Sequence, residues 1–512
     1  MKNISNVLYK FSNTAISFFA CIFSGLIFLL NFMFNSVVGY DSDEKVTISY
    51  HIVKSIIMIA VAAVLIFAAA YFKKYISKIN EKGLFCLLSI MYTLFALYLI
   101  FNCDSNIRAD ASTTFSAAKA VLGGDYSTMQ AGGYIHRYPH QSGMMLYDQM
   151  LMQFSENTAF NFLVNFFFVL GINFFNYKIA DQLFKSKSVN LLTVAVSFAF
   201  LPQFFYIMFA YGLIPGFFFM IVAFYNTIKY ANNRKLINFI CMTLCAACSV
   251  VFKKNYMIGV VAIIIYLVLK LLKEVNIKHI AAVTAMILCL ILPSNIIICV
   301  YESLSGTQLN EGTPSILWVA MGTDIDNNVR APGWYNGFNY SAYTESGYDS
   351  QAAAELGKEK VIENLEKIKN EPVKAFVFFR DKTISQWCEP MYQSVWSGPL
   401  ESCNQYTHTE LLQSIYNGKN AENAIATFSK FLCLIIWAFS FLFVYKHANK
   451  HDGWQIMFLF FIGGLIFHTL WEGKSQYIYP YVFCMIPFAM FAVADTVKTA
   501  EGLLIKIKPS KH

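Results

Sequence analysis

Long apolar runs recur along the whole 512-residue chain, and they constrain its fold more than any other feature. Each run is about 17–23 residues long, which matches a helix crossing the roughly 30 Å hydrocarbon layer of a bilayer at 1.5 Å per residue. Hydrophobic residues make up 57% of the chain and charged residues only 14%, a composition too apolar for a water-soluble domain. The runs predict an all-α polytopic membrane protein with about twelve transmembrane helices, at 15–35, 52–71, 84–101, 158–177, 189–209, 212–228, 236–252, 257–273, 279–301, 428–446, 454–471 and 476–494.

Lysine and arginine are distributed unevenly between the segments that join these spans. With the N-terminus in the cytoplasm, the inner segments hold 21 cationic residues, against eight in the short outer segments and the loop at 102–158. Cytoplasmic segments of membrane proteins are enriched in such residues. We therefore predict a multi-pass plasma-membrane protein with both termini in the cytoplasm. Because the net charge of +8 mainly reflects this topology, we infer no nucleic-acid partner from it.

The predicted spans divide the chain into five parts. Two long polar regions, a first loop at 102–157 and a mixed domain at 302–427, separate the spans in 1–101, 158–301 and 428–512, and the topology predicts that both face outward. Cys388 and Cys403 in the second region would pair only if that face is oxidising, and the sequence leaves this open. The sequence has no Walker A loop or dinucleotide fingerprint, so ATP-driven transport by this chain alone is not expected.

The first outward loop carries the most informative chemistry. Its apolar residues Phe115, Ala118 and Leu122 recur at three- and four-residue steps, which predicts an amphipathic helix on the membrane surface that begins at Asp110. A carboxylate there, where a lipid phosphate and a water-borne acceptor can meet, is placed to act as a general base. The alternative is that Asp110 only caps the helix, since Asp is a favoured capping residue. Asp104 is the nearest rival for the catalytic role.

Two lysine positions contradict the charge bias. Lys253-Lys254 and Lys474 fall in very short turns that the topology predicts on the outer face. A partly desolvated lysine binds phosphate more strongly than one in bulk water, so we predict that these residues bind the phosphate of a lipid-linked substrate. The alternative is that they reach ordinary anionic lipid headgroups. Arg137 and Arg380 are further candidates for binding the same phosphate.

Several stretches of the chain together resemble a known class of membrane enzyme. The acidic Asp110 follows an early span, the next predicted helix ends in Leu122-Gly123-Gly124-Asp125, and Tyr138-Pro139 comes after it. Near the C-terminus the chain reads Trp471-Glu472-Gly473-Lys474-Ser475-Gln476-Tyr477. These motifs resemble the GT-C glycosyltransferases, which use polyprenyl-phosphate-linked sugars, and among them the glycosyltransferase family 39-like enzymes of Gram-positive bacteria, distant kin of protein O-mannosyltransferases and aminoarabinose transferases.

The resemblance implies a GT-C-like bundle with two extracytoplasmic loop regions, and it gives Asp110 the family's catalytic acidic position. Many relatives carry Asp-Glu there, whereas this chain has Asp110-Ala111, and Gln476-Tyr477 stands where relatives often carry Arg-Tyr. Polar side chains of the first loop and of the C-terminal motif are expected to hydrogen-bond to substrate, and outward aromatic side chains to stack on sugar rings. The predicted substrate-binding residues are Tyr134, His136, Tyr138, His140, Gln141, Trp334, Tyr335, Trp387, Glu472 and Tyr477.

Metal-binding patterns are weak in this sequence. Asp324-Ile325-Asp326 has the spacing of the metal-binding carboxylates of nucleotide-sugar transferases, but three-residue patterns are common by chance. His136 and His140 stand four residues apart, and Pro139 between them argues against the regular helix that a shared metal would need. We expect no divalent metal and no cofactor; the polyprenyl-phosphate sugar is a substrate.

The sequence thus predicts a membrane glycosyltransferase. The sugar donor is expected to be carried on undecaprenyl phosphate or a similar lipid and to reach the enzyme from the bilayer. The acceptor is expected to be an extracytoplasmic cell-wall polymer, another glycan, a lipid or a protein, and the transfer a single inverting displacement. Two alternatives remain: a transporter or flippase of a lipid-linked precursor, and an oligosaccharide polymerase or ligase. The two long outward regions favour the enzyme, because transporters of this length usually keep short loops.

Overall fold

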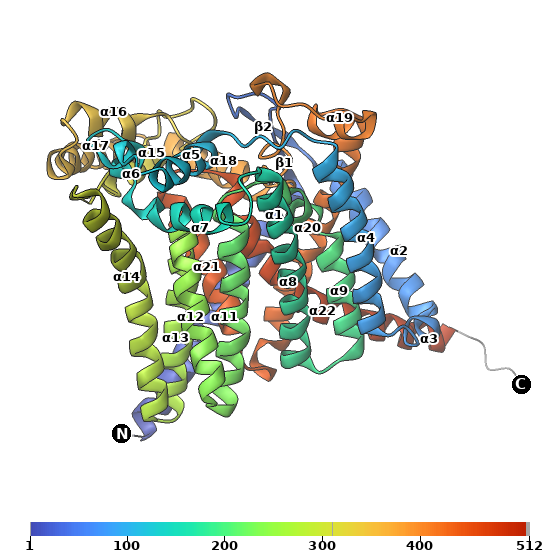
Figure 1. The fold of residues 1–512 in the computed structure, drawn as a ribbon. Coiled ribbons are helices and arrows are strands. Elements are labelled where there is room, and N and C mark those ends of the chain that lie inside the picture. Colours follow the sequence, from blue (N-terminus) through green and yellow to red (C-terminus); the bar gives the residue numbers. More distant parts are fainter. Residues whose placement is uncertain (1, 310, 508–512) are drawn as a thin grey trace, which may run out of the picture.

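The structure is a bundle of long helices covered at one end by a layer of shorter ones. The computed structural model describes residues 2–309 and 311–507. In Figure 1 the long helices run vertically, and the shorter elements gather at the upper end. The first residues of the N-terminal helix lie at the opposite end of the bundle.

Nine helices of the described residues are long and apolar enough to cross a membrane. One of them, α13, reaches this length only together with the 3-10 turn η4 (Lys254–Tyr256) that precedes it. The nine are α1 (Lys2–Met33), α2 (Ile52–Tyr71), α4 (Glu81–Phe101), α8 (Thr158–Phe184), α11 (Leu213–Asn233), α13 (Met257–Lys273), α14 (Ile277–Ser305), α20 (Asn420–His447) and α22 (Tyr479–Ile507).

Three further predicted spans fall on a bent pair of helices and on two shorter helices. The helices α9 (Lys187–Ala199) and α10 (Leu201–Phe205) meet at a 50° bend, next to a proline in the first turn of α10, and form a tenth span if counted together. The apolar helices α12 (Leu236–Phe252) and α21 (Gln455–Leu470) have only 17 and 16 residues. The prediction of a polytopic helical protein is confirmed, and the count of twelve spans stays a prediction.

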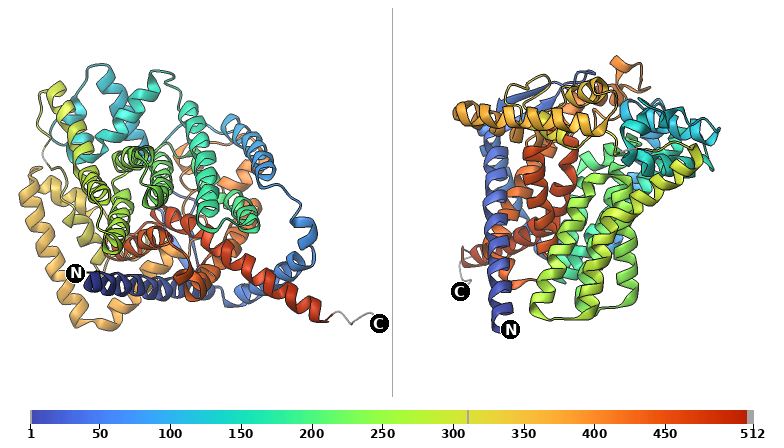
Figure 2. Two further views of the ribbon diagram at one scale, coloured as in Figure 1. Left: turned by 90° about the horizontal axis from the view of Figure 1, so that it is seen from below. Right: turned by 90° about the vertical axis from the view of Figure 1, so that its left-hand side faces the viewer.

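The burial of these helices separates a bundle interior from a lipid-like surface. In α11 and α22 most side chains are buried by protein, whereas α2 and α14 bury few of theirs and expose many large apolar side chains. Exposed apolar surface of this extent is unfavourable in water and is ordinary in contact with lipid. The view from below in Figure 2 shows α22 crossing the bundle obliquely between the other long helices.

The layer at one end of the bundle is built from both long polar regions and from one hairpin. The hairpin follows α1 and pairs the antiparallel strands β1 (Phe34–Val38) and β2 (Val46–Tyr50). The first polar region forms α5 (Ala109–Leu122), α6 (Tyr134–Arg137) and α7 (Ser142–Met152), so the helix predicted from Asp110 to Leu122 is present. The second forms α15 (Ile316–Thr323), α16 (Phe338–Glu345), α17 (Ser350–Asn370), α18 (Pro372–Trp387) and α19 (Glu410–Tyr416), while the short α3 (Lys73–Ile76) lies at the other end.

Backbone hydrogen bonds join the two polar regions into one layer. The Asp104 amide donates to the Tyr406 carbonyl at 3.0 Å, and the Thr313 amide donates to the Arg137 carbonyl at 2.8 Å. Side chains at the contact between the two regions are therefore held in fixed relative positions. Cys388 and Cys403, the possible disulfide pair, are both free thiols.

The shared layer gives a direct test of membrane orientation. In an otherwise thiol-free chain, Glu359→Cys on α17 and Lys78→Cys beyond α3 place exposed thiols at opposite ends of the bundle. We expect a membrane-impermeant thiol reagent to label position 359 in intact cells and position 78 only after permeabilisation. The reverse pattern would place the polar layer in the cytoplasm.

Candidate functional site

The turn between α21 and α22 lies at the centre of the polar layer. Its Lys474 ammonium is 2.7 Å from a carboxylate oxygen of Glu44 on the hairpin and 5.3 Å from the centre of the Trp396 ring. The Lys474 side chain is 19% exposed, and the neighbouring Glu472 is buried. A lysine and a glutamate from one short turn thus lie together in a largely desolvated position.

A buried lysine on α18 fixes the start of this turn. The Lys382 ammonium donates to the carbonyl oxygens of Gly322 and Trp471 at 2.6 Å each and of Thr469 at 2.9 Å. Three hydrogen bonds to carbonyl groups compensate part of the cost of burying this charge. The end of α21 and the segment after it are therefore held against α18.

Trp334 fixes the next part of the turn. Its indole N–H donates to the Ser385 hydroxyl at 2.9 Å, and its backbone forms a parallel bridge with Gly473. A side chain at Gly473 would lie 2.8 Å from the Trp334 ring, so glycine is needed for this close approach. Trp334 is only 1% exposed, and it supports the turn instead of presenting an open face to a ligand.

Asp110 approaches the same turn from α5. Arg108 occupies the N-cap position of the helix without a side-chain capping hydrogen bond, and Asp110 is the second residue of the first turn, so Asp110 is not at the capping position. Its side chain is exposed, and its charge acts on Lys253, Glu472 and Lys474. Asp110 therefore belongs to the same electrostatic group as the α21–α22 turn, although about 360 residues separate them in sequence.

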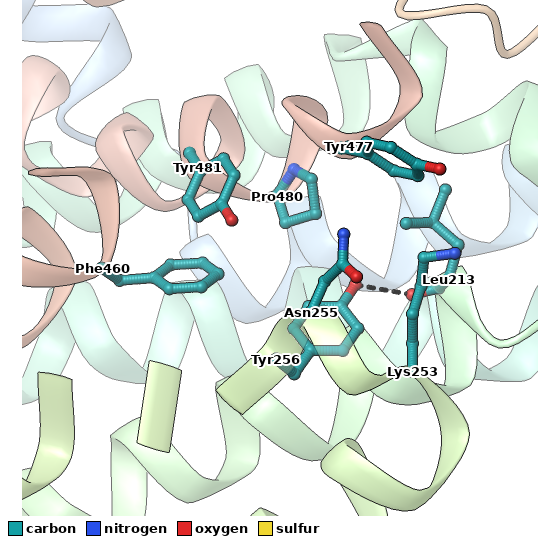
Figure 3. Close-up of a pocket in the computed structure, with 8 residues that line it drawn as sticks. All are labelled: Leu213, Lys253, Asn255, Tyr256, Phe460, Tyr477, Pro480 and Tyr481. Atoms are coloured by element: carbon teal, nitrogen blue, oxygen red, sulfur yellow. Dashed lines mark hydrogen bonds between the residues drawn. The ribbon is translucent and has the colours of Figure 1, made fainter. Parts of the chain in front are cut away.

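Lys253 reaches this group from the turn between α12 and α13. Its ammonium lies 4.7 Å from the centre of the Tyr211 ring and 5.3 Å from that of Tyr477, within range of a cation–π interaction. Lys253 also lines a small pocket, to which Phe460 and Tyr481 contribute from α21 and α22. Figure 3 shows the Lys253 ammonium and the Tyr477 hydroxyl on one side of this pocket and these two rings on the other.

Burial shifts the pKa of each of the three charged groups of the two turns. It lowers the pKa of Lys253 to about 8, and the nearby Lys474 charge acts in the same direction. It also lowers the pKa of Lys474 to about 8, against the opposing effect of Glu472 and Asp110. Burial raises the pKa of Glu472 to about 7. Groups with such shifts change charge near neutral pH, which is common at functional sites.

Three further charged groups, Glu44, Arg108 and Arg330, complete the arrangement, and the sequence did not single them out. Arg330 forms an ion pair with Glu44. The Arg108 guanidinium lies 4.0 Å from the centre of the Trp396 ring, and its charge acts on Lys474. We call Glu44, Arg108, Asp110, Lys253, Arg330, Glu472 and Lys474 the charged cluster.

Tyrosines surround the charged cluster. The charge of Asp110 raises the pKa of Tyr134, Tyr138, Tyr211, Tyr335 and Tyr477, in each case after burial as the larger cause. Gln141 donates a hydrogen bond to the Tyr211 hydroxyl. Five of the ten predicted substrate-binding residues thus lie beside Asp110 or belong to the cluster: Tyr134, Tyr138, Tyr335, Glu472 and Tyr477.

Other predicted residues lie at the edge of this arrangement. The Arg137 guanidinium lies 5.6 Å from the Tyr138 ring centre and 5.1 Å from that of Tyr340, and its charge acts on Tyr335. His140 is close enough to Lys253 and Lys254 for their charges to lower its pKa, after burial as the main cause, to about 3. Lys254 itself is exposed.

The remaining predicted residues have structural partners elsewhere. The Asp104 carboxylate accepts a hydrogen bond from the Tyr406 amide at 2.8 Å and contacts the His408 ring at 3.1 Å. Arg380 pairs with the adjacent Asp381 on α18. His136 is buried against Tyr343 and Tyr348, and Trp387 is buried against Trp437, Phe461 and Tyr481.

The weak metal-binding patterns have other partners as well. Asp326 forms ion pairs with Lys367 and Lys374, and Asp324 with Lys360. Within residues 2–309 and 311–507, no group of three or more histidine, cysteine or acidic side chains is placed to hold a metal ion.

No signal in the sequence distinguishes Arg330 and Glu44 from similar residues. Arg330 is a cation on the predicted outer side, as Lys253 and Lys474 are, but it belongs to a long region, where the charge rule carries little information. Glu44 stands in an acidic stretch with Asp41 and Asp43, and only the fold distinguishes the buried residue from its exposed neighbours.

Comparison of the chain with models of known protein families and with curated proteins finds no match.

The different surroundings of the two candidate aspartates predict different effects on stability. Asp104→Asn weakens a side-chain contact between the two polar regions, and we expect it to lower the free energy of unfolding by about 1 kcal/mol. Asp110→Asn alters an exposed side chain, and we expect it to change the free energy of unfolding by no more than about 0.5 kcal/mol. Thermal unfolding of both variants in the same detergent measures the difference. Equal destabilisation would show that Asp110 also has a structural role.

Proposed function

We propose that this chain is a membrane glycosyltransferase of the GT-C type. It transfers a sugar from a polyprenyl-phosphate-linked donor to an acceptor on the extracytoplasmic side of the membrane. The observation that carries the proposal is the convergence of Asp110 with Lys253 and Lys474, which come from three distant segments, at the polar end of an apolar helical bundle. A base and two phosphate-binding cations are the groups that such a transfer requires.

The proposed reaction is one displacement at the anomeric carbon. The acceptor hydroxyl gives its proton to the Asp110 carboxylate as its oxygen bonds to that carbon. The bond from the carbon to the phosphate oxygen breaks on the opposite face, and the polyprenyl phosphate leaves with the electron pair. Lys253 and Lys474 stabilise the negative charge that develops on the phosphate. The configuration at the anomeric carbon inverts, and no covalent enzyme intermediate forms.

The surroundings of Lys253 fit a lipid-linked donor. The pocket that Lys253 lines is otherwise formed mainly by aromatic and apolar side chains, among them Tyr256, Phe460 and Pro480. A phosphate group bound by Lys253 would therefore lie at the polar end of the bundle, next to these apolar side chains. A lipid-linked donor likewise has a charged phosphate next to a hydrocarbon chain.

The tyrosines around Asp110 fit a sugar. The charge of Asp110 acts on the side chains of Tyr134, Tyr138 and Tyr335. A tyrosine side chain combines an apolar ring face, which can stack on a sugar ring, with a hydroxyl that can hydrogen-bond to it. In this proposal they contact the donor sugar or the acceptor beside the base. The buried Trp334 and Trp387 serve instead to hold the surrounding segments in place.

The decisive test replaces Asp110 by asparagine, which has the same shape but cannot act as a base. Asp110→Asn should lower the rate of sugar transfer by about 10²–10⁴-fold, the usual effect of losing a positioned general base. Sugar transfer is measured as the rate at which wall polymers, lipids and proteins gain the mass of a sugar. The cells lack the native gene and carry the variant.

A matched control comes from the same loop. Asp125→Asn removes an exposed carboxylate that accepts a hydrogen bond from the Ser127 amide, and it should leave transfer within a few-fold of the parent. If Asp110→Asn transfers sugar as fast as this control, Asp110 is not the base, and the buried Glu472 becomes the first alternative. If no glycan mass depends on the gene at all, the enzyme proposal itself fails.

The lowered lysine pKa values predict how donor binding depends on pH. Below their pKa of about 8, Lys253 and Lys474 are charged, and above it they lose the charge that binds phosphate. Raising the pH from 7 to 9 should therefore weaken the binding of undecaprenyl phosphate by about tenfold for each lysine, because the phosphate group itself is already ionised. Binding to protein in nanodiscs measures this effect.

Arginine substitutions provide the control for the pH effect. Arginine stays charged throughout this range, so Lys253→Arg and Lys474→Arg should each remove part of the pH dependence, and the double variant most of it. If both arginine variants lose affinity with pH as the parent does, a different group controls binding.

A further inference from the structure

The hairpin between α1 and α2 places a buried carboxylate, that of Glu44, in the charged cluster. Glu44 lies in the loop between β1 and β2, and its side chain is only 3% exposed, while Asp41, Asp43 and Lys45 in the same loop are exposed. Its backbone has a positive φ of 53°, which is strained for a residue other than glycine. The loop thus adopts an unfavourable local conformation in which this one carboxylate points inward.

Two cations hold the Glu44 carboxylate. One oxygen is 2.7 Å from the Lys474 ammonium and accepts a hydrogen bond from the Gln393 amide at 3.3 Å. The other oxygen pairs with the Arg330 guanidinium. A planar guanidinium beside an ammonium is a common arrangement for binding phosphate.

We propose that Arg330 and Lys474 form a binding site for the phosphate group of the substrate, and that the Glu44 carboxylate occupies this site until the phosphate replaces it. The identification of this phosphate as a polyprenyl-linked one rests on the proposed function. The new elements are Arg330 as a phosphate ligand and Glu44 as its internal competitor.

The balance of charge supports the exchange. With Glu44 in place, the cluster combines four cationic side chains with three acidic ones. A sugar–phosphate–lipid diester carries one negative charge, as a carboxylate does, so replacement of Glu44 by the diester leaves the sum of charges unchanged. Undecaprenyl phosphate, the monoester that leaves in the proposed reaction, brings up to one negative charge more. Without either anion, two partly buried cations would face each other unpaired, which is costly.

Tyr40 at the start of the hairpin loop packs against Gly418 and the bundle core and would stay in place, so only the tip around Glu44 would move. The tip is held to the second polar region by a hydrogen bond from the Val46 amide to the Arg330 carbonyl at 3.0 Å and by one from the Trp396 indole to the Asp41 carbonyl at 2.8 Å. Release of Glu44 from the site would also relieve the positive φ at this residue. The alternative is a permanent structural ion pair that keeps the hairpin closed.

The first experiment compares two acidic residues of the loop. Binding of undecaprenyl phosphate to the full chain in nanodiscs is measured for the parent, Glu44→Gln and Asp43→Asn. Removing an internal competitor raises the fraction of sites open to ligand, so Glu44→Gln should bind about tenfold more tightly. Asp43→Asn removes the same charge from an exposed position of the same loop and should bind as the parent does. Arg330→Gln should bind more weakly than the parent.

A second experiment uses the unaltered protein and so does not depend on how the variants fold. Hydrogen exchange of the loop amides at 39–46, including Val46, is followed with and without undecaprenyl phosphate. We expect the ligand to increase exchange in this loop, because displacement of Glu44 frees the tip. Unchanged or slower exchange would favour the permanent ion pair.

The outcomes separate this inference from the proposed function. If the parent binds undecaprenyl phosphate but Glu44→Gln binds equally or more weakly and the loop is not loosened, the exchange is wrong while a lipid-phosphate substrate remains supported. If neither the parent nor Glu44→Gln binds undecaprenyl phosphate, the proposed donor class fails as well. Tighter binding in Glu44→Gln together with increased loop exchange in the parent supports the exchange.

Discussion

The cost of placing charge in hydrocarbon governs this structure. A charged or unpaired polar group in the bilayer core is unfavourable by several kcal/mol, so the membrane segments are helices with apolar surfaces. The ionisable groups of the cluster are confined to one end of the bundle, where turns between helices meet two long polar regions. At that end Glu44, Glu472 and Lys474 are still largely removed from water, and buried charges there have polar partners: Lys474 is paired with Glu44, and Lys382 on α18 donates to three carbonyl groups.

The membrane architecture was predictable because its signal is local. An apolar run of the right length identifies a helix without knowledge of its neighbours. Eleven of the twelve predicted spans fall mainly on one helix each, and 189–209 falls on the bent pair α9 and α10. The hairpin was not predicted, because β1 (Phe34–Val38) continues the apolar run of α1 and nothing in so short a stretch separates strand from helix. The 50° bend between α9 and α10 lies next to Pro202, in the first turn of α10, where proline interrupts a continuous helix.

The candidate site was predictable only in part, because its residues meet through long-range contacts. Asp110, Lys253 and Lys474 each carried a signal of their own, a surface-helix start or a cation on the unexpected side. Arg330 and Glu44 carried none, since their significance lies in a pairing across some 290 residues. Burial was equally hidden: Trp387 ends a polar helix, yet its ring lies against Trp437 in the bundle interior.

The pairing of Glu44 with Lys474 also orders events in the life of the chain. Glu44 is made first, and Lys474 follows some 430 residues later, in the turn before α22. At about 5–20 residues per second, the ribosome needs roughly 20–90 seconds to supply the second partner after the first. During that interval the hairpin has its acidic loop but not the cation of Lys474, and a chain interrupted before Lys474 never obtains it. The charged cluster can therefore form only after α21 and the turn that follows it have been made.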